Sequence, residues 1–164
     1  MANLTRKYVE QYIDEVNKSI KELEDDYEII KEKNRYYSLR RLNMYKGELQ
    51  ISQSGVGFLL TNDEVLKDIF IYSEDLKNAM NKDICLVEVK PNKFSKTGLR
   101  VGKVLKVLQR GQEFYIGEIS VHHKSKIIYL KEENFFIGVD DLSNRFVDGH
   151  IVTFKLSGNK LKPF

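Results

Sequence analysis

Three aromatic side chains lie in two short runs of strand-like sequence, GVGFLL (55–60) and DIFIY (68–72). Alternation along a strand puts Phe58 on one face of the first run, and Phe70 with Tyr72 on one face of the second. If the runs are antiparallel neighbours, the three rings form one patch. Exposed rings of this kind stack on single-stranded bases, at about 1–3 kcal/mol per base. The residues alone favour the alternative, in which the rings fill the domain interior.

A basic segment, 90–110, contains Lys and Arg but neither Asp nor Glu. Clustered cations are the electrostatic footprint of phosphate binding. Lysines that protect a solvated sheet edge would give the same composition, so charge alone does not separate the two interpretations. The best candidates for phosphate contact are Arg100, Lys103 and Lys106.

Two glycines, Gly55 and Gly57, flank Val56 just before Phe58. Glycine within a strand marks a bulge or a close approach by another backbone or a ligand. We therefore expect these glycines to let a nucleotide approach the strand beside the Phe58 ring.

The carboxylates and histidines are not spaced in the sequence as catalytic or metal-binding residues would be. The acidic doublets at 25–26, 63–64 and 140–141 are isolated in sequence, whereas two-metal hydrolysis needs several converging carboxylates. His122 and His123 are adjacent, so a strand would point them to opposite faces. We predict no catalytic residue, no metal site and no small-molecule substrate for this chain.

The elements that would position these side chains are mostly strands. Apolar residues at helical spacing predict a helix over 3–25, followed by a hairpin near residues 29–37. From residue 45 the chain shows five short alternating runs separated by turn residues, which indicates a small barrel or sandwich.

The strand pattern then repeats after about 70 residues. We divide the chain into 1–44 (helix and hairpin, partly winged-helix-like), 45–111 (first barrel) and 112–164 (second barrel). In the second copy, Phe136 takes the place of Phe70, while Ile128 and Gly138 replace Phe58 and Tyr72. The matching segments are YKGEL with YIGEI, DIFIYSEDLKNAM with NFFIGVDDLSNRF, and KDICLVEV with GHIVTFKL.

Composition bounds the class of protein. The chain has 164 residues, 41% of them apolar, and its net charge of +3 says little about partners. The N-terminus lacks the apolar block of a signal peptide, and no apolar run reaches the length of a membrane span. The single Cys85 permits no internal disulfide. We expect a soluble, cytoplasmic monomer.

The motifs, in order, resemble a known family. GVGFLL (55–60) and DIFIYSEDL (68–76) are similar to the two RNA-binding motifs of cold-shock domains, which are five-stranded barrels of the OB type. The whole order resembles the N-terminal half of ribonuclease R-like exoribonucleases, in the ribonuclease II family. Further matching stretches are RYYSLRRL (35–42), GKVLKVLQR (102–110), YIGEI (115–119) and NFFIGVDDL (134–142).

The resemblance implies a mainly β protein with an N-terminal helix and two tandem five-stranded OB barrels. It implies single-stranded RNA as the partner, contacted by Phe58, Phe70, Tyr72 and Phe136. Val56 stands where that family usually has an aromatic residue, so one stacking ring is missing. In the family a separate catalytic domain holds magnesium, so this chain would guide RNA to a 3′→5′ exoribonuclease domain without being an enzyme itself. The alternatives are a free-standing cold-shock-like RNA chaperone or translation factor, and an OB-fold scaffold that binds protein.

Overall fold

The computed structural model describes residues 2–61, 67–122, 125–131, 135–139, 146–157 and 160–163. The chain divides into two compact units, Met1–Tyr45 and Lys46–Phe164, which are taken separately below. No helix in the described part of the chain is long and apolar enough to cross a membrane.

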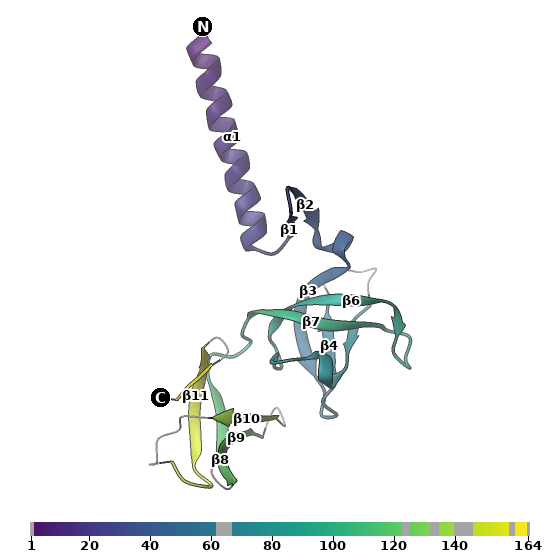
Figure 1. Cartoon of the computed structure of the whole chain (residues 1–164), viewed down its shortest axis with the longest axis vertical. Helices are drawn as coiled ribbons and strands as arrows, with labels where there is room; N and C mark the ends of the chain where they lie inside the picture. Colours follow the sequence, from purple (N-terminus) through teal and green to yellow (C-terminus); the bar gives the residue numbers. More distant parts are fainter. Residues whose placement is uncertain are drawn as a thin grey trace. The chain divides into compact units, whose positions relative to one another are not determined.

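The first unit contains the predicted helix, α1 (Ala2–Asp25), and a hairpin (Figure 1). The hairpin strands β1 (Ile29–Glu32) and β2 (Arg35–Ser38) are antiparallel, and the short helix η1 (Leu39–Leu42) follows them. The turn into β1 is closed by Tyr27 in the left-handed region, with the Glu28 amide donating to the Leu23 carbonyl. Much of the apolar stripe of α1 is exposed.

A closed five-stranded barrel follows, in the strand order β3-β4-β5-β7-β6. All its neighbouring strands for which the register is given are antiparallel except β5 and β7, which are parallel. This parallel pair joins the third and fifth strands and so removes the free edges of the sheet. The elements are β3 (Met44–Ile51), β4 (Gly57–Leu60), β5 (Ile69–Ile71), η2 (Ser73–Asp75), β6 (Ile84–Phe94) and β7 (Arg100–Gln109).

Alternate residues of these strands fill the barrel, which explains why the sequence alternates. Leu49, Leu59, Ile69, Ile71 and Val87 are fully buried there. Cys85 is also buried, and desolvation raises the pKa of its thiol to about 12, with the nearby Asp83 carboxylate adding to the shift. The first of the two predicted five-stranded barrels is therefore present.

The second copy of the pattern is an open sheet, so the prediction of a second closed barrel is wrong for the described residues. Its strand order is β10-β9-β8-β11-β12. The barrel has the equivalent order, β5-β4-β3-β6-β7, if it is opened between its third and fifth strands, β5 and β7. The pairs of the open sheet are all antiparallel. Its strands are β8 (Tyr115–His122), β9 (Ser125–Leu130), β10 (Phe135–Val139), β11 (Ile151–Ser157) and β12 (Lys160–Pro163).

One detail shows that the two copies share more than strand order. In the barrel, the Leu49 amide donates to the Asp83 carbonyl, and the Lys82 amide donates to the Leu49 carbonyl, at 2.8 and 2.7 Å. In the open sheet Ile119 makes the same two bonds with His150 and Gly149, at 2.8 Å each. Lys82 and Gly149 both have positive φ, 67° and 81°. The duplicated sequence thus builds one local structure twice.

Candidate nucleic-acid interface

The rings of Phe58, Phe70 and Tyr72 form one cluster on the outside of the barrel, hereafter the aromatic patch. Phe58 lies directly opposite Phe70 in the β4–β5 register. Their ring centroids are 5.6 Å apart, and those of Phe70 and Tyr72 are 4.8 Å apart, both in edge-to-face geometry. Tyr72 is 38% exposed.

The direction of these rings follows from their chain neighbours. Leu59, Ile69 and Ile71 alternate with the patch residues and have no exposed surface. Because successive strand residues point to opposite faces, the patch must face outward. The rings therefore do not fill the interior of the barrel, as the alternative interpretation required.

The glycines beside Phe58 have roles other than the expected one. Gly55 has a φ of 79° and closes the β3–β4 turn, with its amide donating to the Ser52 carbonyl at 2.9 Å. Gly57 faces the core, where a Cβ would lie 2.7 Å from Leu76 and 3.0 Å from Leu49. One glycine makes a turn and the other makes room for leucines, so each has a reason within the fold itself.

Ion pairs neutralise part of the basic segment 90–110. Lys103 pairs with Glu88 at 2.8 Å, and this hydrogen bond raises the pKa of Lys103. Lys90 pairs with Asp75 of η2. The acids come from outside the segment, which is why a charge count over 90–110 overstated the positive charge of this face.

Arg110 makes the most buried of these pairs, with Asp83 at 2.7 Å. Asp83 is fully buried and also accepts the Met80 and Gly111 amides, at 2.8 and 2.9 Å. This network joins the start of β6 to the end of β7. We assign Arg110 a structural role on that basis.

The other predicted phosphate contacts, Arg100 and Lys106, lie at different points along β7. Val101 lies beside Phe70 in the parallel β5–β7 register, so Arg100, the preceding residue, points to the opposite face of the strand. Arg100 is exposed. Lys106 is exposed too, but it pairs with Leu86 in the other half of the β7 strand. The fold therefore brings Lys103, which shares the strand face of Val101, near the patch, and leaves Arg100 and Lys106 apart from it.

The open sheet has an aromatic pair that the sequence comparison missed. Phe136 lies opposite Tyr129 in the β9–β10 register, with the two rings stacked at 4.7 Å. Phe136 is 57% exposed. Ile128, predicted to replace Phe58, is instead buried opposite Ile119, as Leu59 is opposite Leu49. The alignment of Ile128 with Phe58 was therefore shifted by one residue, and in a strand such a shift moves a side chain to the opposite face of the sheet.

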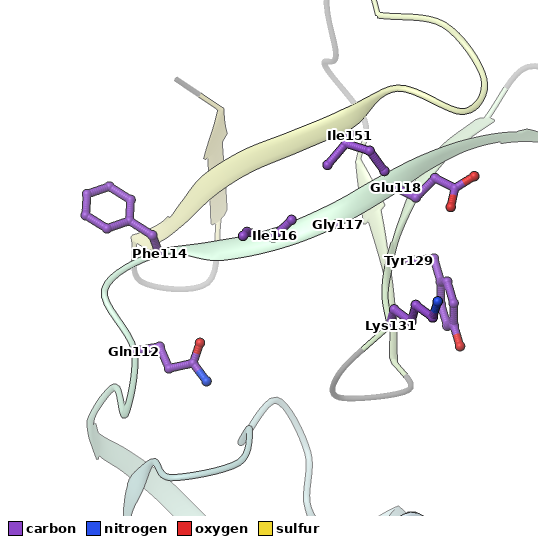
Figure 2. A pocket seen from close by; sticks show the side chains of 8 residues that line it. All are labelled: Gln112, Phe114, Ile116, Gly117, Glu118, Tyr129, Lys131 and Ile151. Carbon is purple, nitrogen blue, oxygen red and sulfur yellow. The ribbon is translucent and has the colours of Figure 1, made fainter.

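A hollow of about 300 Å³ lies in the open sheet beside this pair (Figure 2). Phe114, Ile116 and Ile151 give it apolar walls, while Glu118 and Lys131 add one charge of each sign. Phe114 also carries the Lys155 ammonium over its ring, 5.6 Å from the centroid. The mixture of apolar and charged walls does not select one class of ligand.

Within the described residues, no three His, Cys, Asp or Glu side chains form a group that could hold a metal ion. The doublets 63–64 and 140–141 and the residue His123 lie outside the described residues, as does the side chain of His122.

Comparisons with known proteins agree with this architecture. Residues 47–107 match the family described as Ribonuclease B OB domain. The chain is similar to Ribonuclease R of Buchnera aphidicola subsp. Schizaphis graminum, with 29% identity over 154 residues, or 90% of this chain and 21% of that protein. The chain therefore spans about a fifth of the length of this relative.

Two solved structures are similar in fold. The Mycoplasma genitalium RNase R in complex with ribose methylated single-stranded RNA gives a TM-score of 0.54 at 11% identity, covering 72% of this chain and 21% of that one. Its apo form gives 0.53 at 12% identity, with the same coverage. Together with the sequence match, they confirm the resemblance to the N-terminal region of ribonuclease R.

Proposed function

We propose that this chain is the single-stranded RNA-binding N-terminal region of a ribonuclease R-like 3′→5′ exoribonuclease, and that it guides RNA to a separate catalytic domain. The observation that carries the proposal is the aromatic patch, whose rings lie on the outer face of a closed OB barrel. In OB folds the face of the second and third strands is a usual binding surface for oligonucleotides. The similar RNase R of Mycoplasma genitalium, by its description, was determined with single-stranded RNA.

In this proposal the rings of the patch stack on bases, while Lys103 contacts an adjoining phosphate. Lys103 would divide its charge between a phosphate and Glu88, its partner at 2.8 Å. Lys106 would contact a phosphate only if the bound RNA strand continues along β7. Stacking accepts every base, so we expect binding with little preference for RNA sequence.

Phe136 has a smaller part in the same proposal. Its ring already stacks on Tyr129, and the sheet that carries both is not a closed barrel. Hydrolysis, with its magnesium ions, is assigned to the separate catalytic domain, and no catalytic step is assigned to residues 1–164.

The test is RNA binding by the chain and by variants that lose one ring. Fluorescence anisotropy with a labelled oligouridine of about 12 nucleotides suits the site size of OB folds. Phe58→Ala and Phe70→Ala should each weaken binding roughly 5- to 150-fold, because a lost stack is worth about 1–3 kcal/mol. Phe136→Ala should have a smaller effect.

The matched control is Tyr8→Ala, which removes an exposed ring from α1 in the other unit. It should bind RNA like the wild type. Circular dichroism should show that all variants keep the wild-type fold. The proposal is wrong if the wild type fails to bind RNA at low salt, or if Phe58→Ala and Phe70→Ala bind as tightly as the wild type.

A further inference from the structure

The apolar side chains of α1 form a narrow stripe that the rest of its unit leaves exposed. At alternating intervals of four and three residues the stripe contains Val9, Ile13, Val16, Ile20 and Leu23. Ile20 is half-buried, and the other four are 40–52% exposed. This alternation is the heptad spacing of helices that pack along a common seam. We call these five residues the α1 stripe; the described part of the unit contains no second α-helix to cover it.

The contacts that α1 makes within itself do not replace this missing burial. Its ion pairs join Arg6 to Glu10 at 3.1 Å and Lys18 to Glu22 at 3.9 Å, and all four side chains are exposed. Exposed pairs of this spacing contribute little to stability. In proteins most of the stability of a helix comes from packing of its apolar face. The α1 stripe therefore calls for a partner that buries it.

The charges of α1 are arranged against its own dipole. Residues 2–13 include two basic side chains and one acidic, whereas residues 14–25 include two basic and five acidic. The first turn has no acidic residue, and the last turn has no basic residue. A helix is positive at its N-terminal end and negative at its C-terminal end, so this arrangement is unfavourable for α1 alone. A compensating partner must bring positive charge to the C-terminal half of α1.

A second copy of α1 that runs antiparallel meets both requirements. Its basic N-terminal half lies beside the acidic C-terminal half of the first, and the two dipoles oppose each other. When Ile13 faces Val16 of the second copy, Val9 faces Ile20, and nearly the whole length of the two helices overlaps. A two-fold symmetric interface needs one surface that is complementary to itself, and the α1 stripe is such a surface.

The ends of the paired helices also match. In the same register Arg6 faces Leu23 of the second copy, and Lys7 faces Glu22. The aliphatic stem of an arginine can cover an apolar side chain while its charged head stays in water. A parallel second copy would instead place the two acidic halves side by side. Charge therefore selects the antiparallel arrangement.

We propose that α1 is a dimerisation element, through which two copies of this chain pair as antiparallel helices along the α1 stripe. The proposal replaces the monomer expected from the sequence. It does not depend on the proposed function, because no RNA takes part in the contact. Such a dimer carries two aromatic patches, one on each chain.

The first test is the mass of the whole chain in solution. Sedimentation equilibrium should give twice the mass of one chain, with dissociation on dilution. Ile13→Glu should raise the dissociation constant at least about 10-fold, because the dimer would bury two unpaired carboxylates. Gln11→Glu is the matched control, since it adds the same side chain on the opposite face of α1 and should dimerise like the wild type. Circular dichroism should show that both variants keep the β-sheet signal.

Engineered cysteines test the orientation of the pair. Positions 9 and 20 lie about 16 Å apart along one helix, too far for a disulfide within a chain. Val9→Cys combined with Ile20→Cys should therefore form a disulfide-linked dimer on mild oxidation. Val9→Cys alone should not, because antiparallel pairing separates the two copies of that position. The wild type measures the background from Cys85, which is buried.

The outcomes distinguish this contact from any other. A wild type that stays monomeric at every concentration overturns the proposal, and so does an Ile13→Glu variant that dimerises as tightly as the wild type. A disulfide-linked dimer of Val9→Cys alone would indicate parallel pairing and contradict the proposed arrangement. Weaker dimerisation of Ile13→Glu together with cross-linking of the double variant supports it. RNA is absent from these measurements, so a failure of the proposed function would leave their result unchanged.

Discussion

The barrel and the open sheet are two copies of one strand order that differ in closure. Both keep the hydrogen bonds between the first and fourth strands, made by Leu49 in one and Ile119 in the other. Among the residues that the structure describes, only the barrel has the parallel pair of third and fifth strands, β5 with β7. The difference shows that a duplicated sequence can preserve local geometry while the long-range pair that closes the sheet is lost.

Closure also changes the surface that each copy presents. In the barrel, Val101 comes to lie beside Phe70, which places Lys103, on the same strand face as Val101, next to the aromatic patch. In the open sheet, no such strand lies beside Phe136 among the described residues, and its ring is paired only with Tyr129. Rings flanked by cations suit RNA better than rings alone, which is why the proposed interface is assigned to the barrel.

The largest expected difference in the free energy of unfolding concerns the residue just before the fourth strand of each copy, Asp83 in the barrel and His150 in the open sheet. Asp83→Ala removes a fully buried carboxylate and leaves the Arg110 guanidinium without its ion pair. We expect the free energy of unfolding to fall by about 3–5 kcal/mol. His150→Ala, at the matching position, is exposed and should change it by less than about 0.5 kcal/mol. Urea unfolding followed by circular dichroism measures both, and equal losses would contradict the assigned role of Asp83.

A glycine in each copy tests how tightly the strands pack. A Cβ on Gly102 of β7 would lie 2.5 Å from Val87 and 2.8 Å from Ile69, whereas one on Gly138 of β10 would meet nothing within 4 Å. Gly102→Ala should therefore lower the free energy of unfolding by about 1–3 kcal/mol. Gly138→Ala should leave it within about 0.5 kcal/mol of the wild type. A neutral Gly102→Ala in the same urea assay would show that the barrel can expand at this point.

The smallest effect is expected where the two copies are most alike. Lys82 and Gly149 both have positive φ, which costs a non-glycine residue about 1–2 kcal/mol. Gly149→Lys should therefore destabilise the chain by about 1 kcal/mol. Lys82→Gly should leave it within about 1 kcal/mol of the wild type, because relief of strain is offset by the greater chain entropy of glycine. Thermal unfolding at equal concentrations compares the pair; a Gly149→Lys variant as stable as the wild type would contradict the cost assigned to positive φ at this turn.

The sequence determined the local features of this protein. Alternation placed Phe58, Phe70 and Tyr72 on one face of their strands. The alignment of the two repeats matched Lys82 with Gly149. The helical spacing of residues 3–25 also agreed with α1, which spans Ala2–Asp25. These features depend on neighbours within a few residues, so local pattern is sufficient to predict them.

The tertiary structure decided everything that depends on residues far apart in sequence. The parallel register of β5 and β7 selected which copy closes, and one residue of register decided that Tyr129, not Ile128, faces Phe136. Glu88 and Asp83 pair with Lys103 and Arg110 and balance their positive charges, while Phe94 is left exposed opposite Arg100. The physical reason is that cross-strand contacts and ion pairs join segments whose separation no local pattern encodes.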